Sequence, residues 1–256
     1  MRLAAWNVNS LKVRLPQVLE WLSTQKPDVL CLQETKIEDA NFPAGEIRAA
    51  GYHSLFTGQK TYNGVAVLSR QAGGEIVVAI PEFGDEQKRV LATTVDGVRV
   101  ICAYVPNGQS VDSDKYRYKL EWLAAFNKWL KDELVRYPQL AVLGDLNIAP
   151  EDRDVHDPQA WEGNVLVSPH ERHAFRELLK LGLKDSFRLF EQPEKSFSWW
   201  DYRLNAFKRN LGLRIDHILL NDALAAACKS SSIDITPRKH ERPSDHAPVL
   251  ADIRNL

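Results

Sequence analysis

Polar residues cluster at the ends of several apolar segments of this sequence. The clusters are WNVNS (Asn7, Asn9), LQETK (Glu34), YVPNG (Tyr104, Asn107), GDLN (Asp145, Asn147), RIDH (Asp216, His217) and SDHAP (Asp245, His246). Most of these side chains offer carboxylate or amide oxygens, hard ligands that favour Mg²⁺ or Mn²⁺. Mg²⁺ commonly binds through a small number of carboxylates together with substrate phosphate. The residue types therefore indicate hydrolysis of a phosphodiester or a phosphomonoester.

The histidines and the tyrosine extend this chemistry. His246 stands between an acid and an apolar segment, and Asp216 is a candidate to orient it. A histidine near several carboxylates gains basicity and can move charge or protons around a phosphate. Tyr104 can donate a hydrogen bond to a phosphoryl oxygen. His217 alternates with isoleucines and is interpreted as structural.

Each candidate also has an ordinary structural interpretation. Asn7 and Asn147 are residues that commonly form turns, Glu34 could cap a helix, and Tyr104 could pack in a core. Independent turns do not explain why so many apolar segments end in metal-type ligands. We therefore favour one joint site.

Short apolar segments and amphipathic segments must position these residues. A helix is predicted over 13–24, and Ser113 is predicted to cap a second, long helix. Asp96-Gly97 predicts a tight hairpin turn between 89–95 and 98–105. Further strands are predicted over 2–6, 28–33, 64–69, 75–80, 140–145, 196–202, 213–220 and 247–253. Frequent hairpins mixed with helices indicate an α/β fold whose sheets are mixed, with helices packed outside.

The composition is that of an ordinary globular enzyme. The chain has 256 residues, a formal net charge of −1, 44% hydrophobic residues and 26% charged residues. These values exclude a disordered or fibrous chain, and the small net charge excludes a protein that holds nucleic acid by bulk charge. No linker-like stretch interrupts the sequence, so we expect a single domain over 1–256.

Cysteine usage and the opening segment indicate the compartment. Cys31, Cys102 and Cys228 lie far apart in apolar stretches and are interpreted as buried thiols. The opening MRLAAWNVNSLKVRL resembles no leader peptide, and no apolar run approaches about 18 residues. We expect a cytoplasmic, reduced protein that has no membrane contact.

A set of motifs in fixed order resembles a known family. The motifs are WNVNS, LQETK, GQKTYNGVAVLSR, YVPNG, GDLNIAP, FSWWDYR, GLRIDHIL and RPSDHAP. In this order they resemble the bacterial exodeoxyribonuclease III branch of the endonuclease/exonuclease/phosphatase superfamily, which includes abasic-site endonucleases. The resemblance implies a four-layered α/β sandwich, with two mixed β-sheets face to face and helices outside. It also implies Mg²⁺-dependent cleavage of DNA by a metal-activated water, with Mn²⁺ able to substitute.

The resemblance also implies a role for each matching residue. The metal set matches Asn7, Glu34 and Asp245, and the catalytic set matches Tyr104, Asp145, Asn147, Asp216 and His246. Within the catalytic set, Asp145 and Asn147 match the pair that positions the attacking water and binds the phosphate. Asp216 and His246 match a carboxylate–imidazole pair. Asn107 matches a group that contacts phosphate. Which group is the base, and whether one or two metals act, stays open.

Segment 195–216 is locally basic and rich in aromatic residues, as expected of a surface that binds DNA. Trp199 and Leu213 match apolar walls of a nucleotide pocket in the resembled family, and Arg203 is a candidate for backbone contact. Lys60 precedes a strand in a glycine-containing loop and is a second candidate. The helix start DKYRYK, with Lys119, faces either DNA or solvent. A long polar loop is predicted over 151–172.

The leading hypothesis is a DNA-repair nuclease with 3′-to-5′ exonuclease, 3′-end trimming and abasic-site endonuclease activities. Its expected partner is double-stranded DNA with damaged, abasic or recessed 3′ ends, and its expected state is a monomer. One alternative is a superfamily phosphatase that acts on phosphoinositides or sphingolipids. A second alternative is a catalytically inactive relative that serves as an RNA-linked regulator or as a protein-binding module, but such a protein should have lost its metal-type ligands.

Overall fold

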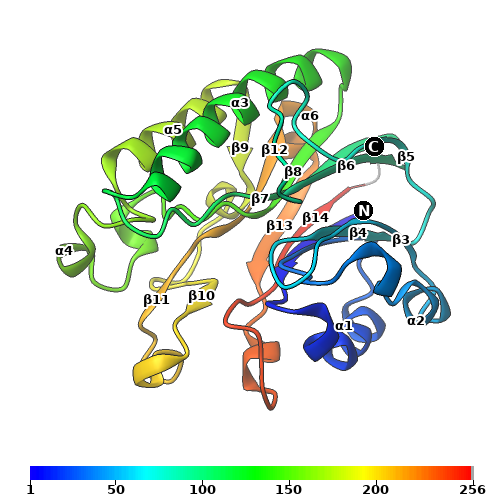
Figure 1. The fold of residues 1–256 in the computed structure, drawn as a ribbon, viewed down its shortest axis with the longest axis horizontal. Helices are drawn as coiled ribbons and strands as arrows, with labels where there is room; N and C mark the ends of the chain where they lie inside the picture. Colours follow the sequence, from blue (N-terminus) through cyan, green and yellow to red (C-terminus); the bar gives the residue numbers. More distant parts are fainter. Residues whose placement is uncertain (255–256) are drawn as a thin grey trace.

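The computed structural model describes residues 1–254 and contains two six-stranded β-sheets packed face to face (Figure 1). In spatial order the first sheet consists of β13 (Cys228–Ile233), β14 (Val249–Ile253), β1 (Arg2–Asn7), β2 (Val29–Gln33), β4 (Val65–Ser69) and β3 (His53–Thr57). The second consists of β5 (Gly74–Val77), β6 (Val90–Val95), β7 (Val98–Tyr104), β8 (Leu140–Asp145), β12 (Asp216–Asn221) and β9 (Leu183–Asp185). Each sheet is mixed, because β1–β2 and β7–β8 are parallel and their other pairings are antiparallel.

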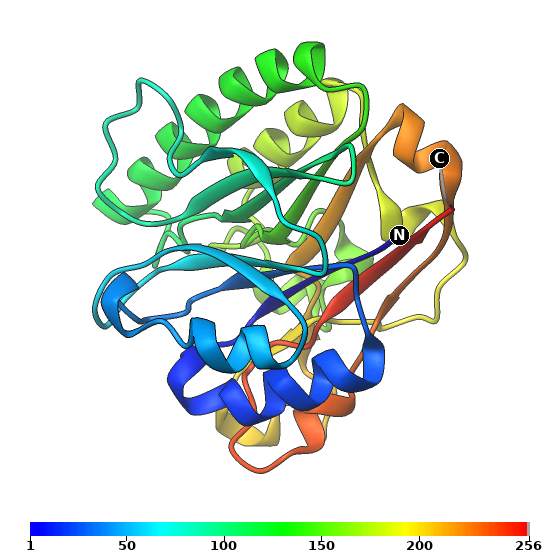
Figure 2. The same ribbon diagram turned by 90° about the vertical axis from the view of Figure 1, so that its right-hand side faces the viewer.

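Helices cover the outer face of each sheet, as the view in Figure 2 shows. The helices are α1 (Leu11–Gln25), α2 (Ala44–Ala49), α3 (Asp114–Arg136), α4 (Pro158–Trp161), α5 (Pro169–Lys180) and α6 (Asp222–Ala227). Apolar side chains of α1 and α2 pack on the first sheet, and those of α3 and α5 pack on the second. A third cluster, which includes Val67, Val100 and Leu143, fills the space between the sheets. This arrangement confirms the predicted four-layered α/β sandwich.

Local chemistry explains the elements that the sequence predicted best. Asp96 and Gly97 have φ angles of 48° and 80°, and the hairpin closes on the pair Val95 and Val98. Ser113 accepts a hydrogen bond from the backbone N–H of Tyr116 and so caps α3 as predicted. The three cysteines are free and buried, as expected. Within the described residues, no helix combines the length and apolarity that crossing a membrane requires.

Three predicted strands are shorter than expected. The strand over 75–80 ends at Val77, because its alternate side chains find no core. The strand over 196–202 is reduced to β10 (Trp199–Trp200), which pairs with β11 (Gly212–Leu213). The strand over 213–220 breaks after Leu213, where the Arg214 amide donates to the Asp154 carbonyl and the amides of residues 215 and 216 donate to the Ser198 hydroxyl.

The predicted loop over 151–172 is also wrong in part, because it contains α4 and the start of α5. Ser168 and Glu171 form a capping box at the start of α5. That signal was present in the sequence, since a serine followed three residues later by glutamate marks a helix start.

Candidate active site at the strand ends

The strand ends bring the polar clusters to one end of the sandwich. Asn7 ends β1, and Glu34 directly follows the neighbouring strand β2. In the second sheet, Asp145 at the end of β8 lies opposite both Tyr104 of β7 and Asp216 of β12. Because parallel neighbours end at the same sheet edge and β12 begins there, all five side chains converge. The sequence-predicted joint site is therefore present as a spatial cluster.

A buried chain of polar contacts links Asp216, His246 and Asp145. His246 Nδ1 lies 2.8 Å from Asp216 Oδ2, and its Nε2 lies 3.7 Å from Asp145 Oδ2. Ser244 holds the segment that carries His246, because its hydroxyl donates to the Asn7 carbonyl and accepts from the His246 backbone amide. The imidazole thus has one nitrogen fixed by a carboxylate and the other directed toward Asp145.

Among residues 1–254, one group of side chains could hold a cation. It consists of Glu34, Asp145 and His246, whose ligand atoms lie within 4.8 Å of one another. The Asn7 amide nitrogen donates to Glu34 Oε1 at 2.8 Å and to Asp145 Oδ2 at 2.9 Å. Its amide oxygen accepts from the Asn9 backbone N–H at 3.0 Å. Asn7 was predicted as a metal ligand. In this structure its side-chain nitrogen fixes two carboxylates, and metal ligation by its oxygen stays a prediction.

Asn147 and Asn107 form a second group beside Asp145. The Asn147 backbone N–H donates to Asp145 Oδ1 at 3.0 Å, and its side-chain amide donates to the Val105 carbonyl. The Asn107 amide nitrogen lies 3.3 Å from the Asn147 side-chain oxygen. Tyr104 is nearly buried, and the Arg89 guanidinium lies 4.6 Å from its ring centre. Burial, reinforced by the Glu34 carboxylate, raises the pKa of Tyr104, so its hydroxyl keeps its proton as a donor.

Burial and neighbouring charges shift the pKa values of Asp145 and His246, which face each other in this cluster. Burial raises the pKa of Asp145 from 3.8 to about 7, and the Asp216 carboxylate adds to the rise while His246 opposes it. Burial opposes the charge on His246, but the carboxylates of Asp216 and Asp145 outweigh it and raise the pKa from 6.5 to about 10. His246 is therefore a cation at neutral pH.

These shifts predict a pH dependence of stability in metal-free buffer. The folded His246 holds its proton more tightly than the unfolded one, so its stabilising contribution is complete below pH 6.5 and is lost toward pH 10. Asp145 acts with the same sign between pH 3.8 and about 7. We expect the Tm difference between wild type and His246→Asn to narrow from about pH 7 to about pH 9. A difference that stays constant in thermal melts with EDTA would contradict the shift.

Asp245 was predicted as a metal ligand, and the structure places it outside the group of ligand atoms. Its Oδ2 accepts from the Trp199 indole N–H at 3.0 Å, and its Oδ1 accepts from the Asn9 side-chain amide at 3.1 Å. Both oxygens are thus engaged by N–H donors. Asp245 orients Trp199, which is half-buried and lines a largely apolar cavity of about 550 Å³.

The basic segment 195–216 is only partly a surface. Leu213 is fully buried and pairs with Trp199 between β11 and β10, so its role as a wall of a nucleotide pocket stays a prediction. Arg214 is also buried, and its guanidinium pairs with Asp154 and Asp185 at 2.7 Å each. Arg203 is exposed at the rim of the Trp199 cavity, where it pairs with Asp201.

Two further lysines, Lys60 and Lys36, lie near residues of the site. Lys60 is exposed in the loop before β4, as predicted, and its neighbour Gln59 lines a cavity that also contains Tyr104 and Asn107. Lys36 was missed, although its Nζ lies 3.1 Å from Glu34 Oε2 and donates to the Asn9 side chain. Its position within LQETK, two residues after Glu34, was the available signal.

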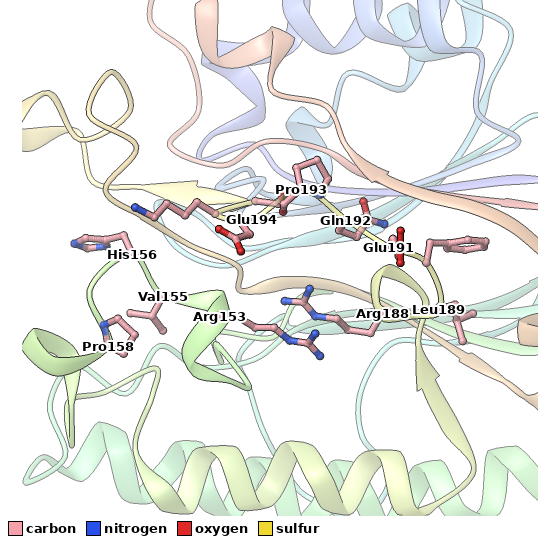
Figure 3. A pocket seen from close by; sticks show the side chains of 13 residues that line it. Arg153, Val155, His156, Pro158, Arg188, Leu189, Glu191, Gln192, Pro193 and Glu194 are labelled. Atoms are coloured by element: carbon pink, nitrogen blue, oxygen red, sulfur yellow. Dashed lines mark hydrogen bonds between the residues drawn. The ribbon is translucent and has the colours of Figure 1, made fainter.

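A cavity of about 860 Å³ adjoins the Trp199 cavity at His156, which lines both. Figure 3 shows the guanidinium groups of Arg153 and Arg188 extending toward one another inside it. Each arginine already has an acidic partner, Glu151 for Arg153 and Asp154 for Arg188. The lining also includes Glu191, Glu194 and Lys195, so charges of both signs face this cavity.

Comparisons with known proteins agree with this geometry. The model of the endonuclease/exonuclease/phosphatase family matches residues 4–246. Exodeoxyribonuclease III of Haemophilus influenzae is 35% identical over 99% of this chain and 100% of its own length. The 3′ phosphatase NExo from Neisseria, solved with a product DNA hairpin, superposes with a TM-score of 0.97 at 47% identity over 99% of both chains. An AP endonuclease from Archaeoglobus fulgidus gives a TM-score of 0.96 at 37% identity over 100% of both chains.

Proposed function

Because this chain belongs to the endonuclease/exonuclease/phosphatase family, we propose that it is a DNA-repair nuclease that hydrolyses phosphodiester bonds of double-stranded DNA. The observation that carries this proposal is the buried Asp216–His246–Asp145 chain beside Glu34. It combines a candidate base, an imidazolium and a candidate metal site at one sheet edge. The activities named for its relatives, exodeoxyribonuclease III, 3′ phosphatase and AP endonuclease, support attack at 3′ ends and at abasic sites.

We propose Mg²⁺ as the cofactor, with Mn²⁺ able to substitute. The residues fit a hard cation, since Glu34 and Asp145 offer carboxylate oxygens and the buried Asp216 Oδ1 has no hydrogen-bond partner. Glu34 and Asp145 would hold the ion, and Asn7 fixes both carboxylates. When bound, the ion supplies positive charge against the phosphate oxygens.

The side chains around this site can divide the work of hydrolysis. Asp145, held through Oδ1 by the Asn147 amide, accepts a proton from the attacking water. His246, cationic and anchored by Asp216, stabilises negative charge that develops on the phosphate. The Tyr104 hydroxyl and the amides of Asn107 and Asn147 supply further hydrogen-bond donors to the phosphate.

The Trp199 cavity is the proposed place for the nucleotide at the 3′ end or at the abasic site. Its indole is presented by Asp245 and half-buried, and a base or sugar can pack on such a face. Arg203 at the rim and Lys60 across the site are proposed to contact the DNA backbone. We further propose that residues 1–256 act as one domain, as a monomer in the cytoplasm, a location that the free, buried cysteines support.

A gel assay on three duplexes tests this function. The duplexes carry a recessed 3′ end, a 3′ phosphate and an internal abasic analogue, and each is incubated with Mg²⁺. We expect shortening of the strand with the recessed 3′ end, release of phosphate from the 3′-phosphate duplex, and incision at the abasic analogue. If none of the three duplexes is processed, the proposed function is refuted.

Replacing Trp199 separates a binding role from a packing role, and its neighbour Trp200 is the matched control. Trp200 is 2% exposed, so Trp200→Ala should cost about 3–5 kcal/mol of stability by opening a cavity. Trp199→Ala should cost much less stability but lower kcat/KM about 5- to 150-fold, as expected from lost base–aromatic contact. Thermal melts beside the gel assay measure both effects. A large fall in Tm with unchanged activity would remove Trp199 from the nucleotide pocket.

A further inference from the structure

A fully buried ion pair lies directly behind the proposed phosphate-binding residues. Lys119 on α3 and Glu171 on α5 are both 0% exposed, and the two helices lie side by side over the second sheet (Figure 1). Burying two charges is costly, and an apolar pair of similar volume is often at least as stable. Stability alone therefore gives a weak reason for this pair, and its other contacts become informative.

The Lys119 ammonium uses its three N–H donors on three separate segments. It donates to the Asn107 carbonyl at 3.1 Å, to the Asn147 carbonyl at 2.6 Å and to the Glu171 carboxylate. Asn107 follows β7 and Asn147 follows β8. These loops are also joined by the Asn107 amide, 3.3 Å from the Asn147 side-chain oxygen, and by the Asn147 amide, which donates to the Val105 carbonyl. One cation thus ties together the two backbones that carry the proposed phosphate donors.

Glu171 fixes the cation from behind. Its carboxylate accepts from the backbone amides of Leu166 and Ser168, at 2.9 and 3.1 Å, and from the Ser168 hydroxyl at 2.6 Å. The Ser168 hydroxyl in turn contacts the Tyr116 hydroxyl at 2.7 Å. The carboxylate therefore has little freedom to move, and it holds the Lys119 ammonium in place.

The backbone conformation of Asn147 shows why the contacts of Lys119 and Glu171 matter for the site. Asn147 has a φ of 50°, a left-handed conformation that costs free energy and persists only where surrounding contacts determine it. Its own N–H also holds the Asp145 carboxylate. Displacing the backbone of Asn147 would therefore move a phosphate donor and the candidate base together.

We propose that Lys119 is a positioning residue, which holds Asn107 and Asn147 in register with Asp145 without touching DNA. This inference rests on the proposed nuclease function. Misplacing reacting groups by about 1 Å can lower a rate by about 10²-fold. We therefore expect Lys119→Met to lower kcat about 10- to 100-fold and to change KM much less, because the groups that it positions act mainly in the transition state.

The chain offers a matched control for the loss of a buried pair. Arg99 on β7 and Glu133 on α3 form a buried ion pair at 2.7 Å, 1% and 3% exposed, which contacts none of the site residues. Lys119→Met/Glu171→Gln and Arg99→Met/Glu133→Gln each neutralise one pair, and the single amide oxygen of glutamine can still accept one of the two backbone amides that Glu171 accepts. We expect comparable falls in Tm, with the loss of kcat confined to the Lys119 variant.

A double-mutant cycle distinguishes positioning from a general structural effect. If Lys119 acts through Asn107 and Asn147, Lys119→Met should cost clearly less in an Asn107→Ala background than in wild type. Purely additive losses, or a folded Lys119→Met/Glu171→Gln variant with wild-type kcat, would overturn the proposal. A double variant without a cooperative unfolding transition would also overturn it, because the role would then be structural. If wild type itself cleaves no duplex, the nuclease function fails instead.

Discussion

Asp145→Asn is expected to lower kcat for 3′-end cleavage by about 10²- to 10⁴-fold, the contribution typical of a positioned acid–base group. An amide at this position cannot accept the proton of the attacking water. It can still occupy the same volume, so the fold should persist. Because Asp145 would also hold the ion, the assay uses saturating Mg²⁺. The loss should then fall on kcat, because the carboxylate acts on the water in the transition state more than on bound DNA.

DNA affinity should not weaken in this variant, since removing a buried negative charge beside a phosphate site reduces repulsion. Asp252→Asn serves as the control, because Asp252 is also a strand carboxylate but pairs with Arg2 instead of site residues. It should leave kcat unchanged. Fluorescence anisotropy for binding and single-turnover gels for rate measure the two effects. An equal loss of binding and rate in Asp145→Asn would assign the residue to substrate docking.

Glu34→Gln is expected to raise the Mg²⁺ concentration required for half-maximal rate by at least about 10-fold. The amide discards charge that a hard cation needs. It also leaves the Lys36 ammonium, now 3.1 Å from Glu34 Oε2, without its carboxylate partner beside the metal site. The uncompensated cation should repel Mg²⁺ further.

Lys36→Met is a matched variant that should change the Mg²⁺ requirement in the opposite direction. Removing this ammonium should lower the Mg²⁺ requirement, because Glu34 would then carry its full charge toward the ion. Titrations of the cleavage rate with Mg²⁺ for wild type and both variants test the pair of expectations. Identical Mg²⁺ midpoints in all three proteins would contradict the assignment of Glu34 as a metal ligand.

Features that depend on neighbouring residues were predicted well. The Asp96-Gly97 turn, the Ser113 cap and the buried strands β2 and β8 follow from local period and turn chemistry. The candidate site followed as well, because polar clusters at strand ends are placed by the sheet itself. Register then aligned Asp145 with Asp216, which no local pattern specifies.

Features that depend on distant partners were not predictable from local patterns. Lys119 was left open between DNA and solvent, yet Glu171, 52 residues away, makes it a buried residue. Arg214 belongs to the basic segment 195–216, which we expected to bind DNA, but it is buried and pairs with Asp154, 60 residues away. Asp245 resembles a ligand by type, and only its contact with the Trp199 indole shows that it orients that ring. The role of a charged side chain depends on the residue with which it pairs, and that residue comes close only when the chain folds.

Single-turnover cleavage of a duplex with a recessed 3′ end, with enzyme in excess, tests the central claim most directly. Excess enzyme removes differences in DNA affinity, so the rate reports the chemistry at the site formed by Glu34, Asp145 and His246. Complete removal of divalent cations with EDTA should abolish cleavage, and added Mg²⁺ should restore it to the original rate. Undiminished cleavage in EDTA would contradict hydrolysis by a metal-dependent site at these strand ends.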